Sequence, residues 1–133
     1  MKKSTVVANI ISVFILIVLL GACSKHDEII SSTTITGDCK LSLYFDHATN
    51  ETSDFNGYTF SFKAGGVLTA TKAATVVNGI WSVNGSKMNI DLGTDILLSK
   101  LNSNWLIEEN TPVYIKLKDD NVSRDDKLQF VKI

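Results

Sequence analysis

The chain has 133 residues and a formal net charge of −1, from 13 basic and 14 acidic side chains. This length allows one domain with one hydrophobic core. A nearly neutral chain whose single arginine is Arg124 has no basic patch, so we expect no nucleic-acid partner and no binding to anionic lipid headgroups.

The start of the chain has the order of a secretory signal. Two lysines come first, an apolar run covers residues 6–20, and small residues then lead into Cys23. The run is shorter than the roughly 20 apolar residues of a membrane-spanning helix. The stretch Leu20-Gly21-Ala22-Cys23 resembles the lipobox of bacterial lipoprotein signal peptides. That resemblance implies that residues 1–22 are removed by cleavage between Ala22 and Cys23, and that Cys23 carries palmitate-type acyl chains and anchors the protein.

Residues 23–36 are polar and rich in serine and threonine, so we interpret them as a tether that precedes a domain at 37–133. Ser24 follows the cysteine where an aspartate would retain a lipoprotein at the inner membrane, which implies an outer-membrane protein on the periplasmic face or the cell surface. The run 25–28 also resembles the export signal of surface lipoproteins of Bacteroidetes. A solvated linker would have the same composition.

After the tether, apolar and polar residues alternate with the period of a β-strand. The alternation predicts eight strands, at residues 40–45, 58–62, 67–71, 77–83, 87–92, 105–107, 113–118 and 127–130. Each has one apolar face, as an antiparallel sheet requires. The links are short, and Asn84-Gly85 is a strong hairpin signal, so we expect an up-and-down meander. The sheet would close into a barrel or fold into a flattened sandwich.

One segment breaks this period. Leu97 and Leu101 are four residues apart, which predicts a short helical turn near residues 95–102 that plugs an open end of the sheet.

The sequence also carries motifs of a known family. Gly79-Ile80-Trp81 with its following hairpin, the segment 55–62, the segment 101–105 and the closing 127–130 are similar to lipocalin-like domains of bacterial lipoproteins. The resemblance covers residues 37–133 and implies a small barrel of a kind that can hold a hydrophobic ligand. Cys39 stands where the family has a large aromatic residue, so either Trp81 or Trp105 fills that space, or this end of the barrel is looser.

The binding candidates follow from the alternation. Five aromatic residues are expected to face inward, where they would line a ligand cavity or form a core: Phe60, Phe62, Trp81, Trp105 and Phe130. We expect a mostly filled interior. Tyr44, Ile80, Leu106 and Tyr114 are expected on the outward face, where a cluster of them would favour a partner protein. The domain is therefore a candidate binding module for a small apolar ligand or a partner, or a structural lipoprotein without a ligand, in either case a monomer.

The sequence has no constellation typical of an enzyme, and we expect neither catalysis nor a cofactor. The loops 46–54 and 119–126 are acidic and should lie at the same end of a closed meander. Calcium is a possible ligand there, although ordinary turn chemistry explains the same residues and we expect no metal. If Cys23 carries lipid, Cys39 has no disulfide partner, and we expect it to be a small buried hydrophobe rather than a reactive thiol.

Overall fold

The computed structural model describes residues 35–133. Strands make up most of this part of the chain, together with two short 3-10 turns. The elements are β1 (Gly37–Asp46), β2 (Thr49–Asn50), η2 (Thr52–Phe55), β3 (Thr59–Lys63), β4 (Val67–Lys72), β5 (Thr75–Asn84), β6 (Lys87–Asp91), η3 (Leu98–Leu101), β7 (Ser103–Asn110), β8 (Tyr114–Asp119) and β9 (Lys127–Lys132).

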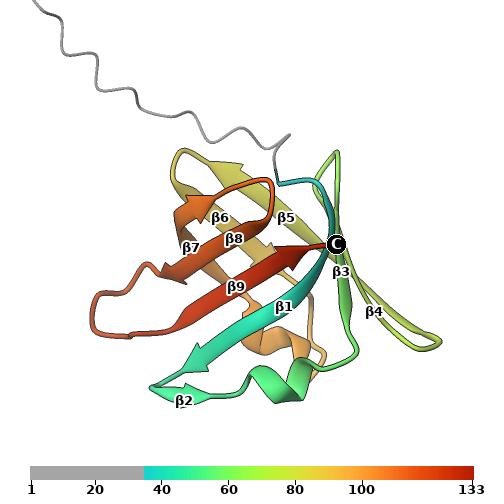
Figure 1. The fold of residues 1–133 in the computed structure, drawn as a ribbon, viewed down its shortest axis with the longest axis horizontal. Coiled ribbons are helices and arrows are strands. Elements are labelled where there is room, and N and C mark those ends of the chain that lie inside the picture. The colour runs from blue at the N-terminus through green and yellow to red at the C-terminus, as the bar shows by residue number, and fades with distance from the viewer. Residues whose placement is uncertain (1–34) are drawn as a thin grey trace, which may run out of the picture.

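The strands form one closed antiparallel barrel. β1, β3 and the strands that follow pair in chain order, and β9 returns to pair with β1, while the two-residue strand β2 only extends the edge of β1. β1 and β9 lie side by side in Figure 1. The predicted eight-strand meander is therefore confirmed, and of the two expected solutions the chain adopts the barrel. Closure leaves the eight barrel strands paired on both sides, which suits residues 35–133, where no helix layer covers a sheet edge.

The connections separate into two ends of the barrel, because consecutive strands are antiparallel. We call the end where the described chain begins the proximal end, and the other the plugged end (Figure 1). The proximal end carries the turns 64–66, 85–86 and 111–113. The plugged end carries the connections 47–58, 73–74, 92–102 and 120–126.

Large aromatic side chains fill the barrel interior. The ring centroids of Trp81 and Phe62 are 5.7 Å apart, those of Phe62 and Phe130 are 5.3 Å apart, and those of Phe130 and Phe60 are 5.2 Å apart. All three pairs have the edge-to-face geometry that aromatic rings prefer. Tyr58 extends this chain of rings, with its centroid 6.0 Å from that of Phe60. Much of the hydrophobic stabilisation of the fold therefore comes from one continuous aromatic core.

The alternation in β1 changes phase at a β-bulge between Leu41 and Leu43. Tyr44, which we expected on the outward face, is consequently buried, while Leu43 and Phe45 are only half-buried. A bulge adds one residue to one strand, so every side chain beyond it changes face. The prediction for Tyr44 was wrong because the bulge depends on pairing with β9 and has no signature in the local sequence.

Two 3-10 turns close the plugged end. η3 buries Leu98 and Leu101, as expected for the turn predicted near residues 95–102. The indole Nε1 of Trp105 donates a hydrogen bond of 2.9 Å to the carbonyl of Leu101. η2, which the sequence pattern did not predict, buries Phe55, and its ring meets that of Tyr44 edge-on at 5.3 Å. Both turns therefore belong to the core.

The structure explains why the Gly-Ile-Trp motif begins with a glycine, because Gly79 lies where there is no room for a side chain. A Cβ atom at this position would lie 2.2 Å from the carbonyl oxygen of Asp91 and 2.9 Å from the Cα of Leu92. Both contacts are with backbone, at the point where β5 crosses closest to the end of β6. A glycine is required here by close approach rather than by backbone torsion.

The core begins before β1. Ile35, which we had assigned to the tether, is fully buried and belongs to the hydrophobic cluster. The packed part of the chain therefore includes Ile35 as well as residues 37–133. On the opposite side of Cys39, β3 places Phe60 as its direct cross-strand neighbour. The cross-strand partner of this cysteine on β3 is thus an aromatic residue.

Candidate functional site

The lipidation site lies outside the described residues. Cys23 and the Ala22–Cys23 cleavage point precede residue 35, and they stay predictions from the leader sequence. Between residues 35 and 133, no helix combines the length and apolar character needed to cross a membrane.

The five aromatic residues proposed as ligand-lining or core are all buried. Phe60 and Phe130 have no exposed surface, and they contact each other across the interior. A pocket of about 430 Å³ opens at the proximal end and includes Trp81, but neither of these phenylalanines lines it. Its other walls come from Thr36, the 64–66 turn and the end of β5. The space beside Trp81 is thus a surface hollow at the barrel mouth.

The indole of Trp81 is held in place by two acceptors. Its Nε1 lies 3.0 Å from the carbonyl oxygen of Lys63 and 3.1 Å from that of Val67. Its backbone N–H donates a 2.9 Å hydrogen bond to the carbonyl of Gly66. These bonds fix the 64–66 turn against β5 and determine the shape of the mouth pocket.

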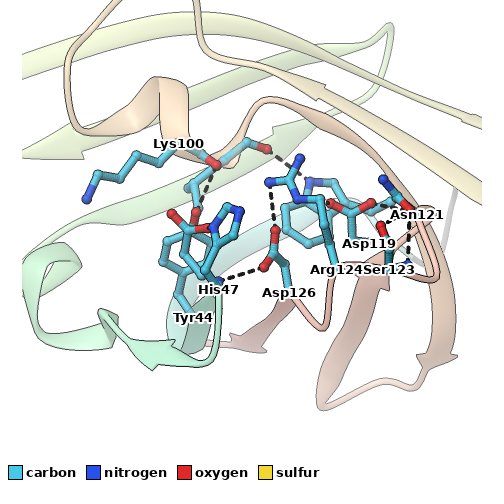
Figure 2. Close-up of polar contacts among 11 residues, drawn as sticks. Tyr44, His47, Lys100, Asp119, Asn121, Ser123, Arg124 and Asp126 are labelled. Carbon is cyan, nitrogen blue, oxygen red and sulfur yellow. Dashed lines mark hydrogen bonds and ion pairs between the residues drawn. The ribbon is translucent and has the colours of Figure 1, made fainter.

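The two acidic loops meet at the plugged end, as predicted (Figure 2). The backbone N–H of His47 donates a 2.8 Å hydrogen bond to Oδ1 of Asp126, which joins the β1–β2 turn to the β8–β9 loop. Arg124 lies over the other oxygen of Asp126, at 2.8 Å, and 3.5 Å from Oδ2 of Asp119. Asp119 and Asp126 are buried, so this arginine compensates two carboxylates that would otherwise destabilise the fold.

Three potential metal ligands also lie together here. Asp46, His47 and Asp126 each offer an atom within 4.8 Å of the others. These atoms already have partners: Nδ1 of His47 contacts Asp46, and Asp126 accepts from His47 and pairs with Arg124. The charge of Asp126 raises the pKa of Arg124, so the guanidinium stays cationic beside the cluster. An arginine in this place opposes a divalent cation electrostatically, and the cluster fits a structural role.

Tyr44 also has a structural environment. Its hydroxyl donates a 3.0 Å hydrogen bond to the carbonyl of Lys100 (Figure 2), and burial raises its pKa well above the ordinary value. The ammonium of Lys100 lies 2.7 Å from Oε2 of Glu51, and that hydrogen bond raises the pKa of Lys100. Tyr44 therefore stays protonated near neutral pH and cannot serve there as an acid or base. Its hydroxyl links β1 to η3 at the plugged end.

Cys39 is a free thiol with no exposed surface, as expected. Burial raises its pKa to about 11. The thiolate is the reactive form of cysteine, so the residue is poorly suited to nucleophilic chemistry.

A polar groove on the outside of the barrel was missed by the sequence reasoning. It has a volume of about 430 Å³ and crosses the outer faces of β5, β6 and β7, ending just beyond β8. Its lining residues are Ser82, Asn84, Lys87, Asn89, Asn104 and Asp120. The available signal was the repeated asparagine at outward strand positions, a residue type that is depleted in strands.

Comparison with known proteins places the fold among lipocalin-like barrels. A lipocalin-like protein from Bacteroides uniformis matches with a TM-score of 0.58 and 17% identity, over 75% of this chain and 99% of that protein. A DUF4847 family protein from Bacteroides vulgatus matches with a TM-score of 0.53 and 14% identity, over 74% of this chain and 93% of the other. No family model matches the sequence, and no curated protein matches it. At these identities the likeness concerns the fold, which agrees with the resemblance seen in the sequence.

Proposed function

We propose that this protein is a lipid-anchored, non-catalytic binding module of the bacterial outer membrane, which engages its target through the outside of the barrel. The observation that carries the proposal is the interior chain of rings from Trp81 through Phe62 and Phe130 to Phe60. A barrel of this size either packs its interior with side chains or holds one small ligand. The rings occupy the interior, which favours binding by the outer surface.

The leader sequence supports the anchoring part of the proposal. Two or more acyl chains on Cys23 would hold the protein stably on a membrane. Residues 24–34 could extend at most about 40 Å, and they join the barrel at its proximal end. The plugged end and the sides of the barrel would therefore be available to a partner in the envelope.

Lipidation is tested by growing cells that express the full chain with radiolabelled palmitate. The wild-type protein should take up label and sediment with the outer membrane. Cys23→Ala should take up none, while Cys39→Ala, the matched control at the only other cysteine, should be labelled normally. Label on the Cys23→Ala protein would contradict the proposed anchor.

A small apolar ligand is the second candidate, and the mouth pocket favours it. The pocket of about 430 Å³ beside Trp81 falls within the range of ligand-binding sites. Native mass spectrometry of the full chain, released gently from cells, distinguishes the two candidates. Surface binding predicts the mass of the lipidated protein alone, whereas a co-purifying molecule that is lost from a Val83→Glu variant would favour the mouth pocket.

A further inference from the structure

The groove on the outer face of β5, β6 and β7 has an ordered polar lining. Ser82 of β5 pairs directly with Asn89 of β6, and Asn89 pairs directly with Asn104 of β7. Asp120 continues this row, because its neighbour Asp119 pairs with Trp105. Asn84 and Lys87, which are also direct partners, form the adjacent wall. Four polar side chains thus line up across three consecutive strands and the residue that follows β8.

Two residues of this row, Asn89 and Asn104, are of a type that is unfavourable in β-strands. Outward positions of a barrel strand are normally favourable for threonine, valine or tyrosine, and asparagine is disfavoured there. Asn89 lies in the middle of β6 and Asn104 near the start of β7, so neither is explained by a turn. Where local propensity and structure conflict in this way, a functional reason is the usual explanation.

The lining also has unused hydrogen-bonding capacity. Nδ2 of Asn89 donates to Oδ1 of Asn104 at 2.9 Å, which leaves the acceptor of Asn89 and the donor of Asn104 available. Across residues 35–133, no hydrogen bond of the protein engages the hydroxyl of Ser82 or the amide of Asn84. The groove therefore offers both donors and acceptors to a ligand, because each amide carries an NH₂ group and a carbonyl oxygen.

The charges of the groove cancel. Lys87 forms an ion pair with Oδ2 of Asp120 along the groove, so the site has no net charge for attracting an ion. A neutral ligand that both donates and accepts hydrogen bonds at neighbouring atoms is complementary to this lining. Vicinal hydroxyl groups of a sugar have that property.

A peptide fits less well. Extended peptides bind by adding to an unpaired strand edge and by burying side chains in apolar pockets. The row at Ser82, Asn89 and Asn104 lies on the face of paired strands, and the groove lining contains no apolar residue.

We propose that the groove at Ser82, Asn84, Asn89, Asn104 and Asp120 is a binding site for a neutral carbohydrate. Lys87 and Asp120 would contribute a donor and an acceptor from their ion pair. The inference deepens the proposed function, because it names the class of target that the outside of the barrel recognises. It does not depend on lipidation, so the palmitate experiment can fail without affecting it.

The test is nuclear magnetic resonance of the full chain in a detergent without a sugar headgroup. The probes are maltohexaose, cellohexaose, mannohexaose and the hexamer of N-acetylglucosamine, each at millimolar concentration. At least one should shift the side-chain amide signals of Asn89 and Asn104 in a saturable manner. If none of the four does so, the proposal is overturned.

A double variant separates binding from folding. Asn89→Thr with Asn104→Thr replaces strand-disfavoured residues by a strand-favoured one, so the unfolding midpoint should stay unchanged or rise. Loss of two hydrogen-bonding partners should weaken the sugar affinity by at least about tenfold. Asn78→Thr, an outward asparagine of β5 away from the groove, is the matched control and should bind normally.

Three results would overturn the assignment. One is an unchanged affinity of the double variant for the sugar, which would show that the sugar binds at another site. The second is tighter binding of hexagalacturonate than of any neutral probe, which would show that the groove selects charge. The third is saturation of the Asn89 and Asn104 signals by a neutral, unstructured peptide instead of a sugar.

Discussion

Replacement of Gly79 by alanine tests the close approach of β5 and β6. The new Cβ would lie 2.2 Å from the carbonyl oxygen of Asp91, more than 1 Å inside ordinary van der Waals contact. Asp91 cannot move away easily, because it pairs with Ile80 and its neighbour Leu92 is buried. The N–H of Leu92 also donates to Oδ1 of Asn102 at 2.6 Å, which fixes the chain after β6.

The expected loss is large for one methyl group. Overpacking of a core costs about 1–3 kcal/mol, and the obstacle here is backbone, so we expect the upper end of that range, about 3 kcal/mol. A domain of this size loses roughly 4–8 °C of melting temperature for each kcal/mol. The melting temperature of Gly79→Ala should therefore fall by roughly 12–24 °C.

The measurement is thermal and urea unfolding of a soluble chain that starts at Ser24, followed by circular dichroism. Gly85→Ala is the matched control, because a Cβ there meets nothing within 4 Å and only the left-handed φ of 60° is unfavourable. The control should lose about 1 kcal/mol. If Gly79→Ala is no less stable than Gly85→Ala, close packing of β5 on β6 is not the reason for this glycine.

Three further predictions concern the plugged end and the buried thiol. Tyr44→Phe removes the hydrogen bond to the carbonyl of Lys100 and should lower the free energy of unfolding by about 1 kcal/mol; urea midpoints equal to wild type would count against that bond. Arg124→Ala leaves the buried carboxylate of Asp126 without its cation and should lower the urea midpoint, whereas a midpoint equal to wild type would show that the pair is dispensable. Cys39 should resist a thiol reagent in the native state. Because burial raises its pKa from 9.0 to about 11, the folded chain keeps a proton that the unfolded chain releases, so stability should fall as pH rises from 9 to 11. That fall should be smaller in Cys39→Ala.

Much of the fold could be predicted from local sequence patterns. The period-two alternation located the eight barrel strands, and the spacing of Leu97 and Leu101 located the 3-10 turn η3. Short links then made the strands antiparallel in chain order, which is why the two acidic loops were expected at one end. These predictions succeeded because each depends on residues that are neighbours in the chain.

The candidate sites were harder to predict. The sequence identified Trp81 and the phenylalanines as inward-facing, but it did not decide between a lined cavity and a packed core. That outcome depends on distances between rings of different strands, such as the 5.2 Å between the ring centroids of Phe60 on β3 and Phe130 on β9. Tyr44 was placed on the wrong face because the bulge in β1 is set by its register with β9. The lipid site at Cys23 stays a prediction of the leader sequence.

The sequence by itself predicted a leader with its cysteine, and it determined the number and order of the barrel strands and the apolar face of most of them. All of these follow from local periodicity and composition. Only the tertiary structure decided that the barrel closes between β1 and β9, that Arg124 bridges two buried carboxylates, and that Asn89 and Asn104 stand side by side in a groove. Closure and the Asn89–Asn104 pair depend on strand register, because a shift of one residue between paired strands would turn the side chains to the other face. The contacts of Arg124 depend instead on the conformation of the connection 120–126 after β8.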